Sequence, residues 1–232
     1  MILAALGPFG DAIDFIFHSR ESQAGTVRVG GLGEIWDLTW THLQLSIVAT
    51  LIATAIAMPL GIWLGHIGRF QFLATSISNI GRAIPALGLV VFFIAFLGVG
   101  FLNVCVALVL LAIPPIITNS YVGIRGVDPE TVDAARGNGL TERQIALQVE
   151  LPMALPTIFA GLRIAASSTV CIAGFAFFAG AGGLGAEIFA DPTFRGNVVA
   201  ASLLMVLLAT ALELVVLLIQ RAATPWERAV GR

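Results

Sequence analysis

The chain has 232 residues, of which 58% are hydrophobic and only 11% are charged. A soluble domain carries roughly 25% charged residues because its surface must face water. This composition therefore excludes an ordinary soluble domain and indicates that much of the exterior faces lipid. The formal net charge of −2 gives no reason to expect a nucleic-acid partner. Cys105 and Cys171 both lie inside apolar runs, where we expect small apolar residues rather than a disulfide.

Residues 1–40 are predicted to form an external N-terminal segment that precedes the membrane domain. The stretch Met1–Arg20 lacks the basic start of a signal peptide, and Asp11 and Asp14 interrupt the apolar run that such a peptide needs. We therefore expect an amphipathic helix lying at the membrane surface. Trp36 and Trp40, which follow it, suit the aromatic belt of a membrane–water interface.

Five apolar runs are long enough to span a membrane, which takes about 20 residues of α-helix. They cover Thr41–His66, Leu73–Gly98, Leu102–Ile124, Leu155–Ala179 and Val198–Gln220. Prolines inside these runs, such as Pro85, predict kinks, which membrane helices tolerate because neighbours and water satisfy the freed carbonyls. Residues 41–220 are thus predicted to form an all-α integral membrane domain, followed by a tail of residues 221–232.

The placement of arginine predicts the orientation of these spans. Nine arginines flank the spans on one side of the membrane and three flank them on the other. Loops on the cytoplasmic side carry an excess of basic residues. We therefore expect the C-terminus and the long loop after the third span to be cytoplasmic, and the N-terminus to lie outside.

One long polar stretch, residues 126–152, separates the third and fourth runs, and we call it the polar segment. It reads GVDPETVDAARGNGLTERQIALQVELP. Asp128, Pro129 and Glu130 supply an N-cap, a first-turn proline and an early acid, which together favour a helix start. Thr141 favours a second helix start, and glycines lie between the two helix starts. The pattern predicts two short helices joined by a bend.

The polar segment resembles the cytoplasmic loop of binding-protein-dependent ABC importer permeases. The pattern of that family is Glu-Ala-Ala, three residues, Gly, nine residues and then Ile-x-Leu-Pro. Every spacing is met here, with Asp in place of Glu and Val in place of Ile as the two departures. The matching residues are Asp133, Ala134, Ala135, Gly139, Val149, Glu150, Leu151 and Pro152. The resemblance covers about Leu43 to Gln220.

The resemblance implies the type I ABC importer permease fold, with a coupling helix that docks on a separate ATPase subunit. The implied coupling residues are Asp133, Ala134, Ala135, Gly139, Leu151 and Pro152. A face of small residues can seat closely in a groove, and Gly139 permits the bend that presents it. The Leu151–Pro152 step is expected to mark where the chain turns back toward the membrane.

The same resemblance implies the partners and cofactors. Two ATP-binding cassette subunits, an extracytoplasmic solute-binding protein and a second permease copy or homologue would complete the importer. ATP and Mg would bind to the ATPase subunits. This chain is expected to carry no cofactor and to catalyse nothing.

Three further stretches resemble the glycine betaine, choline and carnitine branch of these permeases. They are IPALGL at Ile84–Leu89, LPMALPTIFAGLRIA at Leu151–Ala165 and GAGGLG at Gly180–Gly185. A quaternary-amine osmoprotectant is the implied cargo. Thr118 departs from the branch, whose members often carry arginine at that position.

Polar residues inside the spans are candidates for the translocation pathway. Asn119, Ser167 and Ser168 could line it, although such residues also bond neighbouring helices. Glu213 is the only acid well inside a predicted span. It either meets a cationic group of the cargo or pairs with an arginine near the inner membrane edge, and both interpretations stay open.

Three other functions were weighed. A related importer for another small solute, such as an amino acid, would show the same coupling motif. A stand-alone secondary transporter usually needs several intramembrane charges, which the sequence lacks. A membrane-embedded enzyme needs a nucleophile and a base, and the sequence offers no such pair. His18, His42 and His66 are too far apart in the sequence to predict a metal site.

Overall fold

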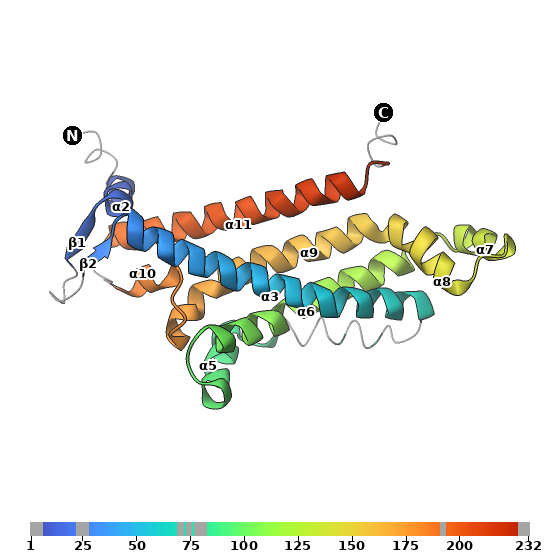
Figure 1. Ribbon diagram of the computed structural model, residues 1–232, viewed down its shortest axis with the longest axis horizontal. Coiled ribbons are helices and arrows are strands. Elements are labelled where there is room, and N and C mark those ends of the chain that lie inside the picture. Colours follow the sequence, from blue (N-terminus) through green and yellow to red (C-terminus); the bar gives the residue numbers. More distant parts are fainter. Residues whose placement is uncertain are drawn as a thin grey trace. The chain divides into compact units, whose positions relative to one another are not determined.

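The computed structural model describes residues 7–21, 28–68, 72, 76, 83–190 and 194–226. Figure 1 shows a mainly helical chain with one short β-hairpin near its N-terminus. The elements before the polar segment are α2 (Pro8–Phe17), β1 (Ser19–Glu21), β2 (Arg28–Gly30), α3 (Leu32–Ile67), α5 (Ala86–Leu97) and α6 (Phe101–Arg125). Those that follow are α7 (Pro129–Gly137), α8 (Glu142–Ile145), the π-helical turn η1 (Ala146–Glu150), α9 (Leu151–Ala173), the 3-10 helix η2 (Gly174–Ala179), α10 (Gly185–Ala190) and α11 (Arg195–Ala223).

Four helices within the described ranges are long and apolar enough to cross a membrane: Leu32–Ile67, Phe101–Arg125, Glu142–Ala179 and Arg195–Ala223. They confirm the first, third, fourth and fifth predicted spans. The first begins nine residues earlier than predicted, and its 36 residues correspond to about 54 Å of helix, more than the roughly 30 Å hydrocarbon core of a bilayer. Helix α3 therefore extends beyond the membrane.

The second predicted span, Leu73–Gly98, is described only in part. Its C-terminal half forms α5, an apolar helix of 12 residues that begins directly after Pro85. Proline restricts the residue before it, which suits a helix start after Pro85, and the kink expected there stays a prediction. The residues at 73–75 and 77–82 lie outside the described ranges.

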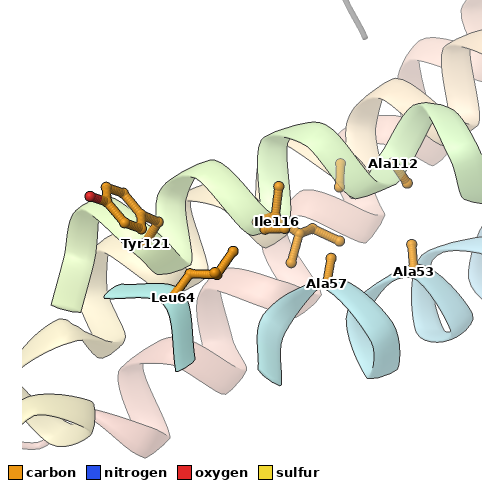
Figure 2. Packing of buried hydrophobic residues seen from close by; sticks show 8 residues of the cluster. Ala53, Ala57, Leu64, Ala112, Ile116 and Tyr121 are labelled. Atoms are coloured by element: carbon orange, nitrogen blue, oxygen red, sulfur yellow. The ribbon is translucent and has the colours of Figure 1, made fainter. Parts of the chain in front are cut away.

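The chain divides into two compact units, and each long helix contributes to both. Unit 2 comprises residues 50–85, 109–167 and 212–232. Its core is a stripe of small residues on α3, Ala53 and Ala57, that faces Ala112 and Ile116 of α6 (Figure 2). A Cβ on Gly61, the next position of this stripe, would lie 2.7 Å from the carbonyl oxygen of Ile117. The stripe therefore lets two membrane helices approach closely, as small residues at i and i+4 do in lipid.

Unit 1 comprises residues 1–49, 86–108 and 168–211. The strands β1 and β2 pair antiparallel, with Arg20 opposite Val29. Ala12 and Phe15 of α2 are buried in a cluster that includes Ile35 of α3. The N-terminal segment thus contains a helix with one face packed into unit 1. Its predicted position at a membrane surface stays a prediction.

Unit 1 also contains buried polar side chains. His42 is fully buried, and its Nε2 lies 2.8 Å from the carbonyl oxygen of Val170. The N–H of Leu184 donates to Nδ1 of the same ring at 3.3 Å. Asn197 donates to the carbonyl oxygen of Glu187 at 2.6 Å. These bonds join α3 to α9 and to the turn before α10, and they join α10 to α11.

Candidate functional site

Helix α7 is built by local signals at both of its ends. The carboxylate of Asp128 accepts a hydrogen bond from the backbone N–H of Glu130 at 2.9 Å, and Pro129 occupies the first turn. At the C-terminal end, the side-chain amide of Asn138 donates to the carbonyl oxygen of Ala134 at 2.8 Å. Such caps satisfy backbone groups that the helix itself leaves unpaired. They confirm the helix start that the sequence predicted.

The bend after α7 depends on Gly139. Its φ of +85° is a left-handed conformation that other residues rarely adopt. The next helix begins at Thr141, whose hydroxyl and backbone form a capping box with Gln144. The predicted bend and the second predicted helix start are both confirmed.

The predicted turn at Leu151–Pro152 is wrong. The helix that begins at Glu142 continues without a break to Ala179. Pro152 offers no N–H to the helix ladder, and the chain widens just before it into the π turn η1, where the N–H of Leu151 donates to the carbonyl oxygen of Ala146. The proline is therefore absorbed by a local change of helix type, and the second helix of the polar segment is continuous with α9.

Charged side chains join α7 to α8. The guanidinium of Arg136 donates to both oxygens of Glu142, at 2.8 and 3.2 Å. Its third donor reaches Asp133 at 2.8 Å. The hydrogen bond to Glu142, with the charges of Glu142, Asp133 and Glu150, raises the pKa of Arg136. The aspartate of the coupling motif is thus linked to the helix that follows the bend.

Helix α7 nevertheless has no buried residue. Asp133 and Ala134 are exposed and Ala135 is half-buried. A helix of nine residues is shorter than the roughly 12–15 residues at which isolated helices become marginal in water. Caps and ion pairs hold α7, and the exposed side chain of Ala134 leaves part of its small-residue face uncovered by the described part of this chain.

A contact that the sequence did not predict lies beside this bend. His66, in the last turn of α3, has Nδ1 2.6 Å from a carboxylate oxygen of Glu150. Its Nε2 lies 3.6 Å from a carboxylate oxygen of Glu142. The partners are 84 residues apart along the chain in the closer pair, and no local pattern announces such a pairing. The sequence predicted only that His66 is too far from the other histidines to form a metal site.

Two of the predicted pathway residues, Asn119 and Glu213, have side-chain partners within unit 2. Asn119 uses its side-chain amide to donate to the carbonyl oxygen of Pro115 at 2.8 Å, and Ser167 and Ser168 are half-buried. Glu213 pairs with Arg163 at 2.7 Å. Of the two interpretations of Glu213, unit 2 contains the ion pair with an arginine. A role for these residues in a pathway stays a prediction.

The glycines at Gly180, Gly182 and Gly185 follow the 3-10 helix η2 rather than a strand. A dinucleotide-binding turn needs a strand before its glycines, so the spacing here belongs to the turn that leads into α10. Within the ranges the structure describes, no three His, Cys, Asp or Glu side chains cluster as a metal site. Cys105 and Cys171 are free thiols.

Long apolar helices with one exposed, capped polar helix between two of them are the architecture of a multi-span membrane protein. Residues 57–229 match the family described as "Binding-protein-dependent transport system inner membrane component". The chain belongs to this family.

Individual relatives agree with that assignment. The chain is 37% identical over 151 residues to the carnitine transport permease protein OpuCB of Listeria monocytogenes, covering 65% of this chain and 69% of the relative. It is 33% identical over 198 residues to the choline transport system permease protein OpuBB of Bacillus subtilis (strain 168), covering 83% and 90%. Among solved structures, an inward-facing form of the MetNI methionine ABC transporter superposes with a TM-score of 0.70 at 25% identity, over 83% of this chain and 97% of that chain. The fold is that of a type I ABC importer permease.

Proposed function

We propose that this chain is the membrane-spanning permease subunit of an ATP-driven importer and forms half of the translocation pathway for a small solute. The observation that carries the proposal is the state of α7, a capped helix with no buried residue that exposes the small side chain of Ala134 beside Asp133. A preformed helix with a small-residue face suits close docking in a groove of a second protein. The second protein would be an ATPase subunit that binds ATP and Mg, since nothing in the sequence of this chain suggests a nucleotide site of its own.

The remaining partners follow from this role. Two ATPase subunits, a second permease copy or homologue and an extracytoplasmic solute-binding protein complete the complex. Asp133, Ala134, Ala135 and Gly139 form the docking element, and Leu151 and Pro152 join it to span α9. A quaternary-amine osmoprotectant, such as glycine betaine, choline or carnitine, is the proposed cargo, because curated relatives of more than 30% identity carry those solutes in their names.

The proposed orientation puts the N-terminus outside the bacterial cell membrane and the polar segment and C-terminus in the cytoplasm. The arginine count supports it. Cysteine introduced as Arg143→Cys, in a chain whose own Cys105 and Cys171 are replaced by alanine, tests it. Membrane-impermeant maleimide should label this site in inverted vesicles and not in intact cells. Labelling in intact cells would contradict the orientation.

The docking role is tested by Ala135→Glu, which puts a bulky acid on the small-residue face of α7. Co-purification of the ATPase subunits with tagged permease should fall by about tenfold or more, because burying an unpaired charge and losing the fit cost several kcal/mol at an interface. Ala222→Glu is the matched control, since Ala222 is exposed near the end of α11 and makes the same change away from α7. Equal co-purification of both variants with wild type would refute the docking role.

The cargo is tested separately, in proteoliposomes that contain the assembled complex. Uptake of radiolabelled glycine betaine, choline and carnitine should require ATP and the solute-binding protein. Uptake of an amino acid instead would support the importer role and refute the proposed cargo. Uptake that persists without any ATPase subunit would contradict the importer itself.

A further inference from the structure

His66 is placed between two carboxylates, one for each ring nitrogen. Nδ1 lies 2.6 Å from Glu150 and Nε2 lies 3.6 Å from Glu142. One ring therefore bridges two carboxylates, one on α8 and one on the π turn η1. We call His66, Glu142 and Glu150 the His66 clasp.

Glu150 makes the clasp hard to open. Its side chain is 8% exposed, against 58% for Glu142. Within the described ranges, His66 is the only basic side chain that lies within 4.0 Å of the Glu150 carboxylate. A buried carboxylate that loses its partner is strongly destabilised. The end of α3 and the π turn that carries Glu150 must therefore stay together or move together.

Glu142 connects the clasp to α7. The same carboxylate that faces His66 accepts two hydrogen bonds from Arg136, and Arg136 also bonds Asp133. An unbroken path of polar contacts thus runs from the coupling motif on α7, across the Gly139 bend, to the last turn of α3. The covalent path between the same two points includes the whole of α6.

Apolar packing joins the same helices beside the clasp. Ile62 of α3 and Leu151 of α9 both pack against a cluster of Ile124, Ala154 and Ile158. An apolar groove of about 440 Å³ opens next to it, with walls from α3, α8, η1 and α9 that include Pro59, Trp63 and Leu147. The clasp adds the polar contact that links the last turn of α3 to the π turn itself.

We propose that His66 is a positioning residue that fastens span α3 to the polar segment, so that a displacement of α7 by its partner moves α3 as well. This rests on the proposed docking of α7. The π turn η1 lies between α8 and α9, and such turns are frequent at functional sites. It is the place where the polar segment can shift relative to α9, and Glu150 at its end takes α3 with it.

The test compares His66→Leu, Glu150→Gln and the double variant in the complete reconstituted complex. The readout is radiolabelled solute taken up per ATP hydrolysed, with glycine betaine, choline and carnitine assayed in parallel, together with ATP hydrolysis in the absence of solute. Each single variant should lower uptake per ATP by about tenfold, the scale of a typical coupling between sites. The double variant should lower uptake per ATP no further than His66→Leu does, because the contact between His66 and Glu150 is lost in all three variants. ATP hydrolysis should continue, which a general folding defect would not allow.

The chain offers a matched control pair and a rescue. His18 and Asp14 on the N-terminal segment form the same kind of contact at 3.0 Å, but with side chains 75% and 63% exposed. His18→Leu should leave uptake per ATP at the wild-type value. His66→Arg, which keeps hydrogen-bond donors beside both carboxylates, should recover at least half of it. Wild-type coupling in His66→Leu, or an equal loss in His18→Leu, would overturn the proposal.

Glu142→Gln keeps the test decisive if the variants at buried positions fail to assemble. Glu142 is exposed, so its replacement should leave assembly intact and lower uptake per ATP by about threefold, in keeping with an exposed ion pair. No change would overturn the link between the clasp and α7. If Ala135→Glu does not release the ATPase subunits, the docking role fails first. If Ala135→Glu releases the ATPase subunits and the clasp variants leave uptake per ATP unchanged, only the role of His66 is refuted.

Discussion

His42 and His66 lie on the same helix, α3, and the polar regions around them differ in the kind of partner that each ring has found. His42 is fully buried and bonded to backbone groups, the carbonyl of Val170 and the N–H of Leu184. His66 faces two carboxylate side chains, of Glu150 and Glu142. We call His42, residues 174–190 and Asn197 the His42 region.

Backbone partners and side-chain partners respond differently to change. Backbone groups cannot swing away, so a substitution in the His42 region must be accommodated by the fold itself. Side chains can rotate and exchange partners, so a substitution in the polar segment alters which groups are linked. We therefore expect changes in the His42 region to affect stability and changes in the polar segment to affect coupling.

Gly185→Ala should produce the largest effect. A Cβ on Gly185 would overlap the carbonyl oxygen of Gly174, which belongs to the backbone and cannot rotate away as a side chain can. Overpacking of this kind costs about 3 kcal/mol or more when nothing can give way. We expect little folded protein from size-exclusion chromatography in detergent, or a sharply lower unfolding midpoint.

Gly137→Ala, at the end of α7, is the matched control for that substitution. A Cβ there meets nothing within 4 Å. Alanine in place of a helical glycine stabilises by about 0.5–1 kcal/mol, so the midpoint should stay or rise slightly. Similar losses in the two variants would show that the two regions do not differ in the way described.

Glu187→Gln should change the pH dependence of stability. Glu187 is 2% exposed, and its Oε2 has no hydrogen-bond partner among the described residues. Burial, and to a lesser extent the charge of Glu34, raises the pKa of Glu187 from 4.5 to about 7. The folded state therefore holds a proton that the unfolded state has released at pH values between these two.

The contribution of Glu187 to stability is therefore greatest below pH 4.5 and falls as the pH rises toward 7. Above pH 7 the folded state carries the full penalty of about 3 kcal/mol that corresponds to a shift of this size. Glutamine cannot ionise, so Glu187→Gln should remove this fall and raise the midpoint at pH 8 relative to pH 5. Glu142→Gln, the same change in the exposed polar segment, should not do so. An unchanged pH profile in Glu187→Gln would show that the carboxylate is solvated or paired.

The same contrast explains what the sequence could and could not predict. Asp128, Pro129, Gly139 and Thr141 act on backbone groups within a few residues of themselves, so the helix starts and the bend were predicted correctly. The pairings of His66 with Glu150 and of Arg163 with Glu213 join residues 84 and 50 positions apart. They arise only when whole helices are packed, so no local pattern contains them.

The extent of two helices was also beyond the sequence pattern. Hydropathy detects the apolar part of α3, but the residues from Leu32 to Trp40 continue the helix with polar side chains among them. Pro152 was read as a turn because proline removes a helix hydrogen bond. A π turn satisfies the same constraint without changing direction, and the sequence alone cannot choose between these two solutions.

Gly139→Ala should have a moderate effect, mainly on docking. The φ of +85° at this position costs a residue with a Cβ about 1–2 kcal/mol. A Cβ would touch nothing within 4 Å, so the strain lies in the backbone alone. The bend should relax and reorient α7, and co-purification of the ATPase subunits should fall by a few-fold. Gly137→Ala again separates the effect of the bend from that of an added methyl group, and equal co-purification of the two would refute the role of the bend.

Arg136→Gln should have the smallest effect on stability and still alter coupling. Its partners Asp133 and Glu142 are exposed, with side chains 74% and 58% accessible, so water can replace the lost contacts and the unfolding midpoint should not move measurably. Uptake per ATP should nevertheless fall, because Arg136 is the one side chain in the described polar segment that contacts both carboxylates. Arg143→Gln is the control, since no carboxylate in the described ranges lies within ion-pair distance of this exposed neighbour. A fall in coupling without a fall in stability, in the first variant and not in the second, would separate the mechanical role of the polar segment from its folding.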